Sequence, residues 1–502
     1  MKEGLKYPVL FLAAAVSWLF VNGLGLQNQK KEIQMVMAIL LIVCLLVILF
    51  LKRKQKLTKD GCIRVILLMG CVMRIGYMLY TPCTLRSHDL WEPEPDATGK
   101  AGYLLHILLE GRLPESNELQ LYQQPFFFLA GAICSKILNA IIGNGDVFLL
   151  VDGAKVVSCF ASCATMFVAE KLFAEFEVGK QNTAYGMLLI AFTPVFYLTG
   201  GRMGEDALCL FFIASALLYT LYWKKEPTWK NTCILALLYG FGMMTKISCA
   251  VPALYTLWVM VEKLFIKKLA VKEKEKNVWK LLFDKENRLL YGKLVVFGCI
   301  SLPLGLWYSL RNWRLFGQGL TYVLPQDVEG PLFTGKVSLM QRFIIPDMKN
   351  LLQTPYANPI DDSNMPVYLL KSELFGEFSY EITPVIPTIL LFLNLLLTVV
   401  AVSFGILLLV RRKQIKGSVV PAVWLLLFGV FAINSYFSYP FGCTMDFRYY
   451  MMLSVIKALL IGKLLQGAGL GKESDENVFL REWVKKGCIL FGIFSCLMYC
   501  LV

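Results

Sequence analysis

The chain has 502 residues, of which 57% are hydrophobic and only 17% are charged. Ordinary soluble chains carry roughly 25% charged residues, so most of this chain cannot face water. The composition excludes a water-soluble enzyme and a disordered chain. The net charge of +14 does not indicate nucleic-acid binding, because the basic residues form short clusters between apolar runs, as the positive-inside rule expects of a membrane protein.

Apolar stretches long enough to cross a bilayer recur from one end of the sequence to the other. They predict an all-α polytopic membrane protein, with one transmembrane domain over residues 1–502 and about 13 transmembrane helices. The predicted spans are 8–26, 35–51, 61–80, 147–168, 184–199, 207–223, 232–245, 247–262, 293–312, 386–410, 418–437, 450–466 and 487–502.

One further apolar stretch, residues 125–142, decides on which side of the membrane every later loop lies. Clusters of lysine and arginine follow four of the predicted spans, and all four lie in the cytoplasm only if 125–142 does not cross. This stretch is therefore predicted to be an interfacial or re-entrant helix, and the N-terminus is predicted to be cytoplasmic. In the alternative topology, 125–142 crosses and residues 232–262 form one long span, which places Lys246 in the middle of the membrane.

The predicted topology leaves two long loops outside the cytoplasm, at residues 81–124 and 313–384. The first loop has three basic and seven acidic residues, and the second has five basic and eight acidic residues. Acidic outer loops opposite lysine-rich inner loops form a consistent asymmetry.

The first outer loop contains a candidate general base. Its segment from Gly99 to Glu110 is apolar at helical spacing, which predicts an amphipathic helix lying on the membrane surface. Asp89 lies between the third span and this helix, near the headgroups, where its carboxylate could remove a proton from an acceptor. The alternative is a solvated loop acid like its neighbours. Candidate substrate-binding residues in the same loop are His88, Asp96, Tyr122 and Gln124.

A second candidate group lies in the sequence TGGRMGEDAL, between two apolar runs, and consists of Arg202, Glu205 and Asp206. Charged residues at the junction of two spans are costly without partners, so they indicate a functional site. An arginine can clamp a phosphate, and the acids can orient an acceptor or hold a divalent cation. The alternative is a simple hairpin turn whose charges mark the membrane interface.

Four more cations lie at predicted outer ends of spans, namely Lys246, Arg311, Arg314 just beyond it, and Arg448. Each of them alone could be a snorkelling interface residue. Together with Arg202, however, they would surround one anionic headgroup in the outer leaflet. The predicted location of all these cations on one side of the membrane is what indicates a shared site.

The order and spacing of these motifs resemble the GT-C superfamily of membrane glycosyltransferases, which includes protein O-mannosyltransferases, oligosaccharyltransferases and lipid A aminoarabinose transferases. The resemblance extends over most of the chain. It rests on the sequences RSHD, GKAGYLLHILLEGRLP, YQQPFFF, GRMGEDAL, LLYGFGMMTKIS, SLRNWRLFG and MDFRYY.

The resemblance implies a GT-C-like helical bundle that transfers a sugar from a polyprenyl phosphate carrier to an extracytoplasmic glycan, lipid or protein, with inversion. It implies that Asp89 is the catalytic base and that Glu205 and Asp206 are the acidic position of the second outer loop. The first outer loop lacks a DxD sequence, and Gln124 stands where the family has the first of two prolines. The missing DxD favours a metal-independent enzyme, so no cofactor is expected, and the expected location is the bacterial plasma membrane.

A transporter or flippase of lipid-linked saccharides is the alternative function. Such a protein would need charged residues at several depths through the bundle. Here the candidate residues gather at one face of the predicted bundle, which favours an enzyme.

Overall fold

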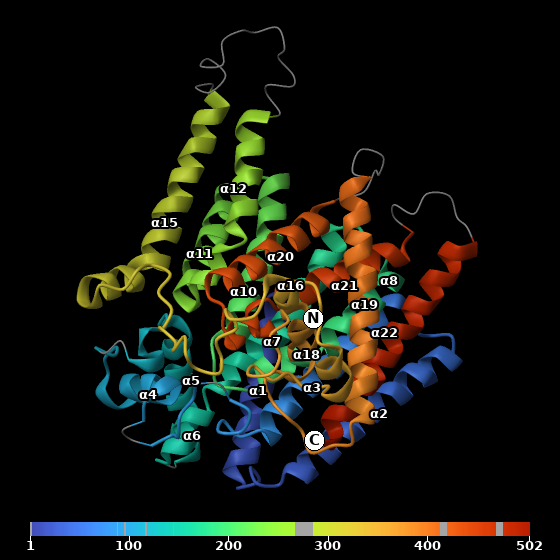
Figure 1. The fold of residues 1–502 in the computed structure, drawn as a ribbon, viewed down its shortest axis with the longest axis horizontal. Helices are drawn as coiled ribbons and strands as arrows, with labels where there is room; N and C mark the ends of the chain where they lie inside the picture. The colour runs from blue at the N-terminus through green and yellow to red at the C-terminus, as the bar shows by residue number, and fades with distance from the viewer. Residues whose placement is uncertain are drawn as a thin grey trace.

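The structure is a computed structural model that describes residues 3–87, 89–94, 97–115, 118–143, 145–266, 285–411, 419–467 and 475–502. Throughout these residues the chain forms helices joined by loops (Figure 1), and one isolated antiparallel bridge joins Phe333 to Phe441. The predicted all-α architecture is confirmed.

The N-terminal part contains α1 (Glu3–Gly23), α2 (Lys30–Arg53), α3 (Lys59–Tyr80), α4 (Gly99–Leu105), η1 (His106–Glu110), η2 (Leu119–Tyr122), α5 (Phe126–Ile142), α6 (Val147–Asp152), α7 (Lys155–Glu175), α8 (Lys180–Phe192), α9 (Pro194–Gly200) and α10 (Asp206–Lys225). The C-terminal part contains α11 (Trp229–Thr245), η3 (Ile247–Ala250), α12 (Ala253–Val261), η4 (Glu262–Ile266), α15 (Lys285–Phe316), α16 (Leu339–Phe343), α17 (Met348–Gln353), α18 (Met365–Phe375), α19 (Val385–Val410), α20 (Val420–Ser438), η5 (Gly442–Met445), η6 (Phe447–Tyr449), α21 (Met452–Leu465) and α22 (Asp475–Leu501).

Among the described residues, ten helical segments are long and apolar enough to cross a membrane. The pair α8 and α9, bent by 47°, makes an eleventh if it is one span. The predicted count of 13 is therefore not confirmed. The two remaining predicted spans, 232–245 and 450–466, correspond to α11 and α21, which have 17 and 14 residues. A straight crossing of the hydrocarbon core needs about 20 residues. Whether the 17-residue α5 crosses stays a prediction.

The structure separates α11 from α12, which argues against the alternative of one long span over residues 232–262. The chain leaves α11 at Lys246, whose ammonium group bonds Asp206 at the start of α10. At the other end, Glu262 follows α12 and accepts a 2.8 Å bond from Lys224 near the end of α10. Helix α11 and the helical segment Ile247–Leu264, which contains α12, therefore run along α10 in opposite directions.

A break between α8 and α9 brings the chain into position for the candidate site. Pro194 cannot donate a backbone hydrogen bond, so the last turn of α8 has carbonyl groups without helical partners. Arg74 of α3 is fully buried and donates to the carbonyls of Ile190 and Ala191, each at 2.9 Å, and to the Ser162 hydroxyl at 3.0 Å. This arginine thus caps the broken helix, and the chain after the break turns as α9 towards Arg202.

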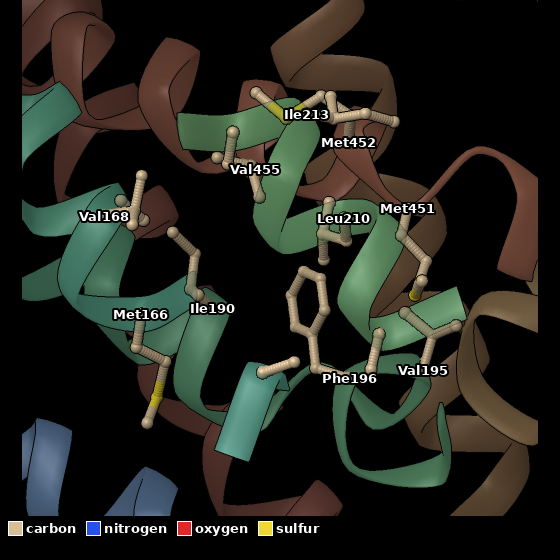
Figure 2. Close-up of a cluster of buried hydrophobic side chains, with 14 of the residues drawn as sticks. Met166, Val168, Ile190, Val195, Phe196, Leu210, Ile213, Met451, Met452 and Val455 are labelled. Atoms are coloured by element: carbon tan, nitrogen blue, oxygen red, sulfur yellow. The ribbon is translucent and has the colours of Figure 1, made fainter. Parts of the chain in front are cut away.

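The hydrophobic core lies where α7, α8, α9, α10 and α21 meet (Figure 2). Apolar side chains from these helices point towards one another, among them Val168, Ile190, Phe196, Leu210 and Val455. The residues between α9 and α10 and the residues just before α21 emerge from this packed centre. Because the core fixes these two short segments, their charged side chains are held in defined positions.

The predicted helix of the first outer loop is present as α4 followed by the π-helical turn η1. Its first half is not an exposed amphipathic helix, because every residue of α4 is buried, and its position at the membrane surface stays a prediction. The helix packs against α5, α6 and η2 and is part of the protein interior. Lys100 is buried with the rest of α4 and is only 3% exposed. The pattern of apolar residues in the sequence does not distinguish it from a lysine on the surface.

Candidate active site

Charged side chains from four distant segments meet in one place, which we call the ion cluster. They come from the first outer loop with α4, from the turn before α10, from the end of α11 and from the segment before α21. The ion cluster consists of Asp89, Lys100, Arg202, Glu205, Asp206, Lys246, Asp446 and Arg448. Its four carboxylates and four cations are mutually paired, as buried charges must be.

Glu205 and Asp206 form the buried centre of the ion cluster, and each is 2% exposed. Glu205 binds Lys100 at 2.9 Å through one oxygen and Lys246 at 3.1 Å through the other. Asp206 binds Lys246 at 2.5 Å and Arg202 at 3.4 Å. The two neighbouring acids therefore share one lysine, and each has a second cation of its own.

The turn before α10 can approach its neighbours closely because it is rich in glycine. A Cβ atom on Gly201 would lie 2.3 Å from the ring of Tyr77, and one on Gly204 would lie 3.3 Å from the Lys100 ammonium nitrogen. Ser158 of α7 donates a 3.0 Å bond to the carbonyl of Gly204. Asp206 begins α10, where the positive end of the helix dipole favours a carboxylate. The local sequence GGRMGED thus fixes both acids.

Arg448 and Tyr449 make the other wall of the ion cluster. The Arg448 Nε lies 3.1 Å from Asp446, and its Nη2 donates a 2.7 Å bond to the Tyr449 hydroxyl. The Lys246 ammonium group stands over the Tyr449 ring, 4.6 Å from its centre. A cation over an aromatic face is attracted by the ring quadrupole. The Tyr449 side chain therefore contacts both Arg448 and Lys246, and Lys246 in turn pairs with Glu205 and Asp206.

Asp89 lies at the accessible edge of the ion cluster. Its side chain is 35% exposed, and its Oδ2 is 3.9 Å from Arg448 Nη2. Its backbone has φ of +53°, a left-handed conformation that costs a non-glycine residue about 1–3 kcal/mol. The backbone N–H of Lys100 donates a 2.8 Å bond to the Asp89 carbonyl, which ties this strained loop to α4. Residues in such conformations concentrate at functional sites.

The charges shift the pKa of two nearby carboxyl groups in opposite directions. Burial alone would raise the pKa of Glu205, but Lys100 and Lys246 outweigh it and lower the pKa to about 2. Burial and the neighbouring Asp446 raise the pKa of Glu377, which follows α18, to about 8, although its Oε1 accepts a 2.8 Å bond from the Tyr368 hydroxyl. At neutral pH, Glu205 is a carboxylate and Glu377 is mostly protonated.

Several of the predicted site residues meet in the ion cluster. These are Asp89, Arg202, Glu205, Asp206, Lys246 and Arg448. Tyr122 lies close enough to them for the charges of Asp89 and Glu205 to act on its phenol. Burial, and then these two charges, raise the pKa of Tyr122 to about 12. His88 and Asp96 lie outside the described residues.

Arg311 and Gln124 have another role in the structure. The Arg311 guanidinium donates a 2.8 Å bond to the carbonyl of Pro114 and a 3.1 Å bond to the Asn312 side chain. The Gln124 side chain donates a 2.8 Å bond to Ser309 of α15. These bonds hold the first outer loop against the end of α15. No ion pair joins Arg311 to the ion cluster within the part of the chain that the structure describes.

Three charged residues in or near the ion cluster were not predicted as site residues from the sequence, namely Lys100, Asp446 and Glu377. Lys100 could have been found from the glycines on either side of it, because GKAG in an apolar helix indicates close packing where a charge needs a partner. Asp446 is two residues before Arg448 and could have been paired with it. Glu377 has no local signal, since it is one of eight acids in a long loop.

The charged site and the apolar bundle define a multi-pass membrane protein with a candidate catalytic centre built from its loops and helix ends. A family comparison matches residues 129–274 to the family described as dolichyl-phosphate-mannose-protein mannosyltransferase. The matched region contains Arg202, Glu205, Asp206 and Lys246. The resemblance to GT-C membrane glycosyltransferases that the motifs indicate is confirmed. No curated protein matches the chain.

Two solved structures are similar to the chain at low sequence identity. The oligosaccharyltransferase of Archaeoglobus fulgidus has 13% identity and a TM-score of 0.44, with 87% of this chain and 56% of that one covered. ArnT from Cupriavidus metallidurans has 13% identity and a TM-score of 0.34, with 81% of this chain and 79% of that one covered. The chain thus spans little more than half the length of the archaeal enzyme.

Proposed function

We propose that the protein transfers a sugar from a polyprenyl phosphate carrier to an acceptor outside the cytoplasm, with inversion at the anomeric carbon. The observation that carries this proposal is the position of Asp89 at the accessible edge of a cluster of fixed cations. Such a displacement requires a carboxylate that can take the acceptor proton and fixed cations that can bind the leaving phosphate, and both kinds of group are present in the ion cluster. The family match over residues 129–274 supports the same reaction class.

The leaving group is a polyprenyl phosphate, on which negative charge develops as the sugar bond breaks. Fixed cations in a site of low dielectric constant stabilise that charge without reorganising. Arg448 and Lys246 suit this role, because Tyr449 and the acids hold both side chains in place. The acids Glu205 and Asp206 therefore act as positioning residues for the cations and do not contact the acceptor.

Asp89 removes the acceptor proton in this proposal. Its carboxylate is the part-exposed acid of the ion cluster and lies 3.9 Å from Arg448. Tyr122 is assigned to the donor or acceptor side of the same loop, with His88 and Asp96 as further candidates. Glu205 and Asp206 are both paired with lysine ammonium groups, so the reaction is proposed to proceed without a metal or other cofactor.

The acceptor is a glycan, lipid or protein, and the proposed location is a bacterial plasma membrane with the N-terminus in the cytoplasm. The basic clusters on the side opposite the ion cluster support this orientation. Under this arrangement the ion cluster lies level with the outer lipid phosphates. The polyprenyl chain of the donor can then remain in the bilayer while its phosphate reaches Arg448.

The test uses purified protein in detergent with a polyprenyl phosphate sugar and a panel of acceptors. We expect the wild-type protein to release polyprenyl phosphate, and Asp89→Asn to reduce that release by at least about 100-fold, because a positioned general base contributes roughly 10²–10⁴. Glu92→Gln, an exposed acid three residues further on, is the matched control and should keep full activity. Full activity of Asp89→Asn would remove this residue from the mechanism, and a wild-type protein inactive with every acceptor would favour a transporter.

A further inference from the structure

A large groove opens between α1, α2 and α3, away from the ion cluster. It has a volume of about 950 Å³, at the upper end of the roughly 300–1,000 Å³ of small-molecule sites. Residues of α1, α2 and α3 line it, together with Phe167 and Glu170 of α7. Helix α2 lies along one edge of the molecule (Figure 1). Most of its wall is apolar, including Val16, Phe20, Leu40 and Leu68.

The groove runs along the membrane-spanning direction. Lys6 and Val21 of α1 both line it, and the helical rise of ~1.5 Å per residue puts them about 22 Å apart. The hydrocarbon core of a bilayer is about 30 Å thick. The groove therefore extends through most of that thickness, where lipid chains and not water fill an apolar surface.

The charged residues of the groove are concentrated at its cytoplasmic end. Lys6, Arg64, Glu170 and Asp60 line that end, whereas Gln29 and Glu32 line the other. Asp60 is paired with Lys180 at 2.6 Å. Within the described part of the chain, Arg64 and Glu170 have no ion-pair partner, and Lys6 contacts the Phe167 ring at 5.8 Å. At this end a lipid headgroup would thus meet two cations, Lys6 and Arg64, and the Glu170 carboxylate.

We propose that this groove binds a phospholipid of the inner leaflet with a zwitterionic ethanolamine headgroup. Lys6 and Arg64 would bind the phosphate, the Glu170 carboxylate would accept hydrogen bonds from the primary ammonium group, and the acyl chains would lie along α1 and α3. A second transmembrane helix fits less well, because helix interfaces in membranes are enriched in small residues and this wall is dominated by leucine, valine, isoleucine and phenylalanine.

The test is native mass spectrometry of the full-length protein with equal amounts of phosphatidylethanolamine, phosphatidylglycerol and phosphatidylcholine. We expect one phosphatidylethanolamine to be retained at least about fivefold over the other two lipids. The double variant Lys6→Gln, Arg64→Gln should lower retention of all three lipids, and Arg53→Gln with Lys54→Gln is the matched control outside the groove. Glu170→Gln should remove the preference for ethanolamine over glycerol while total retention is kept.

A second pair of variants tests the groove itself. Ala13 lines the groove, so Ala13→Trp should fill it and abolish specific retention, whereas Leu12→Trp, its exposed neighbour outside the lining, should have no effect. Variants are compared only when they elute as a single species like the wild type. Preference for phosphatidylglycerol, unchanged binding in Ala13→Trp, or displacement of the lipid by polyprenyl phosphate would each overturn the proposal.

Discussion

The Lys246 ammonium group lies 2.5 Å from the Asp206 carboxylate, which joins the end of α11 to the start of α10. The same ammonium group reaches Glu205 at 3.1 Å and the Tyr449 ring at 4.6 Å. One lysine thus connects both buried acids to the segment that presents Arg448. The connection makes the ion cluster a single unit, since removing this cation alters every wall of the site.

Replacing Lys246 by methionine should destabilise the protein and abolish sugar transfer. Asp206 would then depend on Arg202 at 3.4 Å for direct pairing, and breaking a buried ion pair from one side costs about 3–5 kcal/mol. Thermal unfolding in detergent measures the loss as a lower melting temperature. Lys246→Arg keeps the charge and should retain most of the stability. Equal melting temperatures for the methionine variant and the wild type would show that the acids do not need this cation.

Most of the ion cluster could be predicted from the sequence, because charged residues are rare in this chain. A charged residue next to an apolar run is costly without a partner, so each one indicates a candidate site. Arg202, Glu205, Asp206 and Lys246 could be found in this way. The sequence could not distinguish Arg311 from these residues, because Arg311 also lies at the end of an apolar run. Only its bond to the Pro114 carbonyl shows that it holds a loop.

The number of spans was harder to predict than the helical class. A hydropathy pattern does not distinguish a helix that crosses from one that is simply buried, and both α11 and α21 are short apolar helices inside the bundle. The burial of α4 was missed for a related reason. Its apolar face fits a membrane surface as well as a protein interior, and only the packing against α5 and α6 decides between them.

Glu377 should make stability depend on pH, because its pKa is raised from 4.5 to about 8. A carboxyl group with a raised pKa in the folded state opposes folding once the unfolded state ionises. The destabilisation therefore begins near pH 4.5, grows as pH rises, and is complete above about pH 8. Glu377→Gln lacks this titration, so its melting temperature should increasingly exceed that of the wild type between pH 5 and 8.

The measurement is a series of melting temperatures from pH 5 to 9 for both proteins. Glu381→Gln, in the same loop, is the control and should follow the wild type. A constant difference between Glu377→Gln and the wild type across this range would mean that the carboxyl group does not titrate there, and that the repulsion from Asp446 is screened.

The closest backbone approach in the site lies in α4 and allows a test that removes no charge. A Cβ atom on Gly102 would lie 1.9 Å from the carbonyl oxygen of Ala97, so alanine at this position must displace the start of α4. That displacement would withdraw Lys100, two residues away, from its 2.9 Å bond with Glu205. We expect Gly102→Ala to lose most sugar transfer, and hydrogen exchange of residues 97–110 to become faster.

Gly298→Ala is the matched control, because nothing lies within 4 Å of a Cβ atom there and alanine favours a helix by up to about 1 kcal/mol over glycine. This variant should keep its activity and unfold at the same temperature or slightly higher. If Gly102→Ala exchanged faster in α4 yet transferred sugar at the wild-type rate, the position of Lys100 would be irrelevant to the reaction. The ion cluster would then stabilise the fold, and catalysis would have to depend on Asp89 and Arg448 without the support of α4.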